Sequence, residues 1–170
     1  MGYIPSGTRL TIRNELYKRG AKPGLVDLKY SYEGKKVKKL IDFIPKLVKT
    51  VFNPTTWQQE LVETKEGGYS ASWRVFKDLD YYTYLRFDLK LEIEFRGDEG
   101  KATIVIGEPC IVSEYPQETY WQKTFIYEIF RVLWHNLFYN KKVEEYMDWG
   151  RTQISCFEEK LFAYFDKLRE

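Results

Sequence analysis

The single histidine of the chain, His135, is the side chain best suited to acid–base chemistry near neutral pH. It lies between Trp134 and Asn136 in an apolar C-terminal segment. One histidine excludes a histidine-rich metal site and any mechanism that needs two imidazoles. Because no acid–base partner is placed beside it, we expect a packing histidine. The functional alternative is a proton donor or polar anchor at a cavity wall.

Two pairs of adjacent carboxylates, Glu144–Glu145 and Glu158–Glu159, fall in a predicted helix. Neighbouring helical positions point to different sides, so neither pair can share acid–base work. The glycines of 66–68 and 97–100 lie in predicted hairpin turns and lack the lysine and serine spacing of a phosphate loop. No catalytic residue, metal site or cofactor is therefore predicted.

The two cysteines, Cys110 and Cys156, match no zinc or redox spacing. We expect both to be buried small apolar residues. A disulfide between them stays open, because intracellular proteins of hyperthermophiles sometimes contain one. The composition favours a thermophilic source, since Asn and Gln are few while Lys, Glu and Tyr are many.

Aromatic residues make up 18% of the chain and can either fill a core or line a pocket with a few hydroxyls for orientation. If they line a pocket, five residues are predicted to bind its ligand. These are Trp73, Phe87, Trp121, Phe125 and His135.

Basic residues are concentrated in the first 50 positions, where twelve Lys and Arg stand against four Asp and Glu. Six of them form a cluster: Lys35, Lys36, Lys38, Lys39, Lys46 and Lys49. We expect a solvated helix face. The functional alternative is contact with an anionic surface such as a membrane. Nucleic acid is not expected, because no aromatic RNA-binding signature or recognition helix accompanies the cluster.

The N-terminal part predicts three elements. Residues 8–19 end in Lys18 and Arg19 and are followed by Gly20, which favours a helix, with a strand through Leu10 and Ile12 as the alternative. Residues 25–32 alternate like a half-buried strand. From Lys35 to Val51 the apolar spacing predicts an amphipathic helix, kinked or divided in two by its proline.

Residues 57–112 predict an antiparallel meander. Segments 60–65 and 69–77 flank a hairpin turn. Apolar residues hold the odd positions of 81–95, which predicts one long strand with a dry and a wet face in a curved sheet. A turn leads to the strand 101–106, and Pro109 marks an edge or a break.

The remainder predicts helices. Apolar residues cover much of the circumference of 117–140, so we expect this helix to be mostly buried. Residues 141–168 instead carry a narrow apolar seam typical of a helix that packs along one partner. The seam consists of Met147, Gly150, Ile154, Phe157, Leu161, Tyr164 and Leu168.

This order of elements resembles the START/Bet v1-like (SRPBCC) helix-grip superfamily from Leu25 to the C-terminus. The resemblance is topological and transfers no catalytic residue. It implies an α+β fold in which a curved antiparallel sheet wraps around a long C-terminal helix, with a cavity for an apolar molecule. We expect one domain over 1–170, with an N-terminal extension (1–24), a helix-grip core (25–140) and a C-terminal helix (141–170). The extension and the last helix depart from the family pattern.

The expected function is non-catalytic binding of a hydrophobic small molecule, such as a lipid or isoprenoid, between the sheet and the C-terminal helix. One alternative is an interaction module that uses the basic helix 35–52 or the C-terminal seam to bind a partner or a second copy. Another is a cyclase- or hydrolase-like enzyme that uses His135 with tyrosines. A cytoplasmic location is expected, because the sequence shows neither a signal-peptide layout nor a long uncharged apolar run.

Overall fold

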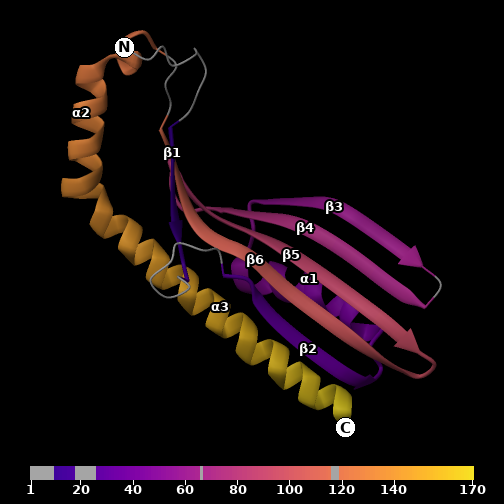
Figure 1. Ribbon diagram of the computed structural model, residues 1–170. Coiled ribbons are helices and arrows are strands. Elements are labelled where there is room, and N and C mark those ends of the chain that lie inside the picture. Colours follow the sequence, from indigo (N-terminus) through magenta and orange to yellow (C-terminus); the bar gives the residue numbers. More distant parts are fainter. Residues whose placement is uncertain (1–9, 18–25, 66, 116–118) are drawn as a thin grey trace.

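The computed structural model describes residues 10–17, 26–65, 67–115 and 119–170 (Figure 1). A curved, six-stranded antiparallel sheet is accompanied by a long helical C-terminal segment, which confirms the predicted α+β class. The elements are β1 (Leu10–Glu15), β2 (Leu28–Lys35), α1 (Lys39–Phe52), β3 (Thr56–Lys65), β4 (Gly68–Asp78), β5 (Thr83–Arg96), β6 (Glu99–Tyr115), η1 (Trp121–Lys123), α2 (Phe125–Trp134), η2 (His135–Tyr139) and α3 (Asn140–Arg169).

The long strand β6 organises the sheet. β5, β4 and β3 follow it on one side in hairpin order, and β1 and β2 both pair with its other side. β2 pairs with the first part of β6 up to Ile106, and β1 pairs with the last part from Cys110. The two short strands therefore share one edge of β6, and its final residues lie beyond the end of β2.

The strand β5 confirms the prediction for residues 81–95. Its odd positions from Thr83 to Ile93 are buried, and its even positions are half-buried or exposed. Phe87 meets Phe52 of α1 with ring centroids 4.7 Å apart, so the dry face of the sheet is covered by helix. The predicted hairpin between β3 and β4 is also confirmed.

The structure decides between the alternatives predicted for two segments in the first third of the chain. The helix over 8–19 is wrong within the described residues 10–17, because that segment pairs its backbone with β6 as strand β1. The alternative through Leu10 and Ile12 is the observed one. Residues 39–52 form a single helix that passes through Pro45.

Pro109 does not end its strand, which continues to Tyr115. Across from Phe87 the ladder shifts register, so that Asp88 faces Gly107 and Arg86 faces Cys110. Such a bulge tolerates a residue without an N–H, and Pro109 lies between the stretches that pair with β2 and β1. Its carbonyl accepts a hydrogen bond from the Leu16 N–H at 3.0 Å.

The helix that lies along the sheet is α3, which contacts β2, β6 and α1. Its buried residues include Gly150, Ile154, Phe157, Leu161 and Leu168, as the predicted seam requires. Met147 and Tyr164 are half-buried, and Phe165 completes the buried face. The seam therefore packs within the chain. Docking of a partner by α3 stays a prediction.

The prediction that residues 117–140 are mostly buried is wrong for the described residues 119–140. Most of the apolar side chains of α2 and η2 are exposed. In Figure 1, α2 lies beyond the end of the sheet and runs in a different direction from α3, with the π-helical turn η2 between them. None of the helices in the described part of the chain combines the length and apolar character needed to cross a bilayer.

Candidate functional site

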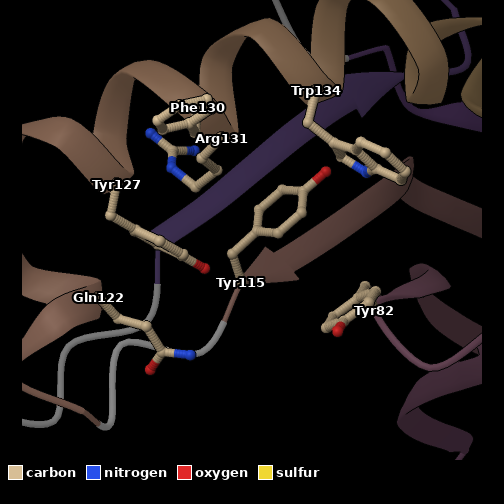
Figure 2. Close-up of a pocket in the computed structure, with 7 residues that line it drawn as sticks. All are labelled: Tyr82, Tyr115, Gln122, Tyr127, Phe130, Arg131 and Trp134. Carbon is tan, nitrogen blue, oxygen red and sulfur yellow. The ribbon is translucent and has the colours of Figure 1, made fainter.

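A hollow of about 300 Å³ lies between α2, the end of β6 and the turn that joins β4 to β5 (Figure 2). We call it the Tyr115 pocket, because Tyr115 lies at the centre of the side chains that line it. The pocket is lined by Tyr82, Tyr115, Gln122, Tyr127, Phe130, Arg131 and Trp134.

Sheet pairing places the two tyrosines that form one wall. Thr83 faces Ser113 in the β5–β6 ladder, and the Glu114 N–H donates to the Tyr82 carbonyl at 2.8 Å. Tyr82 and Tyr115 therefore lie side by side, with ring centroids 5.8 Å apart and planes inclined by 24°. Stacked rings of this kind form a flat apolar wall.

Helical spacing places the opposite wall. α2 begins after Thr124, whose hydroxyl accepts a hydrogen bond from the Tyr127 N–H at 3.4 Å. Tyr127, Arg131 and Trp134 then recur at steps of four and three residues, which brings them to one side of the helix. That side faces Tyr115.

Arg131 is the charged group of the pocket. Its side chain is 7% exposed, and one guanidinium nitrogen donates to Glu128 at 3.0 Å. The guanidinium lies over the Tyr115 ring, 5.7 Å from the centroid, which is a cation–π distance. Its Nε has no hydrogen-bond partner among the described residues. A buried cation with a donor left over is costly, and a ligand acceptor would relieve it.

His135 is hydrogen-bonded to Tyr115. The Tyr115 hydroxyl and His135 Nδ1 are 2.7 Å apart. Burial, together with the charge of Arg131, lowers the pKa of His135, and burial raises the pKa of Tyr115. Near pH 7 the tyrosine therefore donates to a neutral imidazole, and the pair ties the start of η2 to the end of β6.

A polar cluster around Asp80 fixes the position of Tyr82. The Asp80 carboxylate accepts hydrogen bonds from the Tyr82 N–H at 2.8 Å, from the Tyr139 hydroxyl at 2.7 Å and from the Tyr146 hydroxyl at 2.9 Å. Lys142 lies 3.4 Å away. Although burial opposes ionisation, these donors lower the pKa of Asp80. The ionised carboxylate thus fastens the β4–β5 turn to η2 and α3.

The five predicted ligand residues lie in three separate places. Trp73 and Phe87 are buried in the core, where Trp73 packs against Trp57 with centroids 5.6 Å apart. Trp121 and Phe125 are exposed on η1 and α2. His135 touches Tyr115 but does not itself line the Tyr115 pocket. Their role in binding stays a prediction.

Sequence reasoning missed the residues that build the pocket. Tyr82 precedes β5 and Tyr115 ends β6. The predicted strand 101–106 stopped nine positions before Tyr115, so the sequence prediction gave no signal for this residue. Arg131 is the one cation between Phe125 and Phe138, and a lone charge in so apolar a helix marks the side that meets other polar groups.

The predicted basic cluster is exposed at all six lysines. Only Lys46 of the six lines the second hollow, of about 530 Å³, between α1 and α3. That groove is lined by Phe43, Lys46, Leu47, Thr50, Lys160, Ala163, Tyr164 and Lys167. Phe43 stacks on Tyr164 at its floor, with centroids 3.6 Å apart. Contact of the lysines with an anionic surface stays a prediction.

The two cysteines are both free thiols, with Cys110 buried and Cys156 half-buried, so no disulfide joins them. Burial raises the pKa of Cys110, even though Arg13 opposes this effect. Within the described ranges, no three His, Cys, Asp or Glu side chains cluster in a way that could hold a metal ion.

The fold and the pocket define an α+β protein with a curved antiparallel sheet, a packed C-terminal helix and an aromatic hollow at the far end. Comparison of the chain with models of known protein families and with curated proteins gives no match. Function is therefore argued from the geometry alone.

The pH dependence of stability should report the state of His135. Because burial and Arg131 lower its pKa in the folded protein, the unfolded chain takes up the proton first as the pH falls below about 6.5. The contribution of neutral His135 to the free energy of unfolding is therefore complete above pH 6.5 and is lost as the pH falls below it. Urea titrations at pH 7.5 and 5.5 should show a larger loss of unfolding free energy in the wild type than in His135→Gln, which keeps an acceptor for Tyr115. Equal losses would contradict this assignment.

Proposed function

We propose that the protein binds a small apolar molecule with a planar ring in the Tyr115 pocket, without chemistry of its own. The observation that carries the proposal is the combination of stacked aromatic walls with the buried Arg131. The pocket volume lies at the lower end of the range for small-molecule sites, about 300–1,000 Å³, which favours a compact ligand.

The proposal keeps the ligand class expected from the sequence and changes its place. Between the sheet and α3, the facing side chains Phe157, Ile154 and Leu161 are fully buried in the hydrophobic core. Close packing of this kind leaves little free space. Room for a ligand is found instead where the end of β6 meets α2.

Arg131 indicates the polar end of the ligand. A carboxylate or a similar acceptor could take the Nε donor, while the ring would lie between Tyr82, Tyr127 and Trp134. His135 Nδ1 is engaged by Tyr115 and His135 does not line the pocket, so it supports the shape of the pocket from outside it. The arrangement therefore favours binding over catalysis.

Calorimetric titration with 2-naphthoate and with neutral 2-methylnaphthalene tests the proposal. We expect both to bind and the carboxylate to bind roughly tenfold tighter, because a charge-assisted hydrogen bond adds about 1.5–3 kcal/mol before desolvation. Equal affinities would show that Arg131 does not reach the ligand. Failure of both to bind the wild-type protein contradicts the proposal.

A matched pair of variants places the ligand. Tyr82→Ala removes one wall of the pocket from the β4–β5 turn without touching α2, and should weaken 2-naphthoate binding about tenfold through lost ring contact. Tyr81→Ala alters the neighbouring residue, which is 88% exposed and does not line the pocket. It should leave binding unchanged. An equal effect of both variants would place the ligand elsewhere.

A further inference from the structure

The outward side of α2 and η2 is an apolar surface of unusual extent. Nine large apolar side chains between Phe125 and Phe138 are 44–75% exposed. They include Phe125, Ile129, Phe130, Leu133, Trp134 and Leu137. We call this surface the α2 face. In Figure 1, α2 lies at the edge of the molecule, away from β2, β3, β4 and α1.

The helix α2 is amphipathic, but its charged residues face the protein and its apolar residues face outward. Its two charged residues, Glu128 and Arg131, pair with each other, and Arg131 is buried on the side of Tyr115. His135 also points to that side. An ordinary surface helix directs its charges to solvent and its apolar stripe to the core. Here Glu128, Arg131 and His135 face the protein and the apolar stripe faces outward, where the described residues leave it uncovered.

The size of the α2 face exceeds what a monomer usually shows. Phe and Trp side chains bury about 150–250 Å² each and aliphatic ones somewhat less, so these nine at their observed exposure present roughly 1,000 Å² in total around the helix. The largest apolar patch of a typical monomer is about 300–600 Å². One partner of a standard protein–protein interface buries about 800 Å². One side of the helix presents less than this total, an area still comparable with one partner's share of a standard interface.

We propose that a second copy of this chain covers the α2 face, so that two α2 helices pack against each other about a two-fold axis. An isologous contact requires a surface that tolerates its own copy. The α2 face meets this condition, because its exposed members carry no charge that would repel an identical partner. Apolar faces without charge at their centre are typical of homodimer interfaces.

A bilayer is the less suitable occupant. Helices that lie on membranes carry exposed Lys and Arg beside the apolar face, where they meet anionic headgroups. Between Phe125 and Phe138 the one cation is Arg131, which is buried and paired with Glu128. The basic cluster of the chain lies on and beside α1, at its N-terminal side and along its exposed face, and not on α2.

The partner would also border the Tyr115 pocket. Phe130 and Trp134 line the pocket and at the same time belong to the α2 face, at 65% and 58% exposure. A second α2 helix seated on this face would cover their outer surfaces. The inference does not depend on ligand binding, because it rests on the exposed area and its lack of charge.

Light scattering after size exclusion tests the proposal with the full chain. We expect the wild type to have twice the 20.4 kDa chain mass at micromolar concentration. Ile129→Glu/Leu133→Glu places two carboxylates on the α2 face and should give a monomer, with dimer affinity reduced at least about 100-fold by buried like charges. Leu61→Glu, at 43% exposure on β3, is the matched control and should remain a dimer.

Three results would overturn the proposal. They are a monomeric wild type at about 100 μM, a monomeric Leu61→Glu variant, or a dimeric variant with both glutamates. Pelleting with phosphatidylglycerol vesicles distinguishes the other occupant, since a wild type that is monomeric in solution and sediments with vesicles has a lipid-binding face. If circular dichroism shows that the glutamate variant is unfolded, Ile129→Ser/Leu133→Ser gives the same readout at lower cost to the helix.

Discussion

Replacing Phe157 with alanine is expected to lower the free energy of unfolding by about 3–5 kcal/mol, the largest effect of any single substitution considered for this fold. Phe157 is fully buried on α3. Its ring lies 6.2 Å from Tyr30 of β2 and 6.0 Å from Phe52 of α1, centroid to centroid. Removing it opens a cavity at the point where both helices meet the sheet, and close-packed neighbours can fill such a cavity only in part.

The comparison with Phe162 makes this prediction specific. Phe162 lies five positions later on α3, is 49% exposed and also approaches Tyr30, at 6.0 Å. Phe162→Ala should cost only about 1 kcal/mol, because little transfer free energy and no enclosed cavity are involved. Urea titrations followed by circular dichroism give both values. Equal losses would mean that α3 does not clamp the sheet through Phe157.

The sequence predicted those elements whose apolar residues recur at one constant spacing because they all face the same part of the core. In β5, every odd position from Leu85 to Ile93 meets the same dry face, so the two-residue period survives intact. On α3, the seam from Gly150 to Leu168 faces one continuous hydrophobic core to which β2, β6 and α1 all contribute, and its spacing follows from that burial.

The parts that could not be predicted depend on partners distant in sequence. β1 carries a helix-like ending, yet its backbone pairs with β6 about 100 positions later, and this pairing outweighs the local signal. Pro109 is tolerated for a similar reason, since the strands on its edge side leave a gap there. The residues next to β1 or to Pro109 in the sequence give no indication of these long-range contacts.

The apolar circumference of α2 shows a different limit. A wide apolar surface indicates that a helix is covered, and the sequence cannot say whether its own chain covers it. Among the described residues, the side of the helix that the chain covers is the one with Arg131 and His135. The prediction of burial was wrong for the isolated chain, and the same residues are the ones from which a dimer interface is inferred.

The candidate site was beyond sequence reasoning because its main walls come from three segments, and Gln122 of η1 adds a fourth. Tyr82 belongs to a turn, Tyr115 to the end of β6 and Arg131 to α2. They meet because Thr83 and Ser113 are paired in the sheet and because Asp80 and His135 fasten the helices to it. The sequence analysis predicted a pocket lined by aromatic residues, but the residues it selected are not the ones that line the Tyr115 pocket.

Asp80 should be the most sensitive residue of this end of the protein. Asp80→Ala is expected to lower the free energy of unfolding by about 2–4 kcal/mol, because it removes an ionised acceptor from three hydrogen bonds and leaves the Tyr139 hydroxyl with Thr83 as its remaining partner. Asp78→Ala, an exposed carboxylate at the end of β4, is the matched control and should cost less than about 0.5 kcal/mol.

The acid dependence of the same variant separates a structural carboxylate from simple packing. The pKa of Asp80 in the folded protein lies below its ordinary value of 3.8, so the ionised form stabilises the fold above that pH. The difference between wild type and Asp80→Ala should stay constant from pH 7 to about 5, then shrink as the pH falls through the folded-state pKa. A difference that is unchanged down to about pH 2.5 would show that the loss comes from the missing side-chain volume, and that the charge of Asp80 does not fasten α3 to the β4–β5 turn.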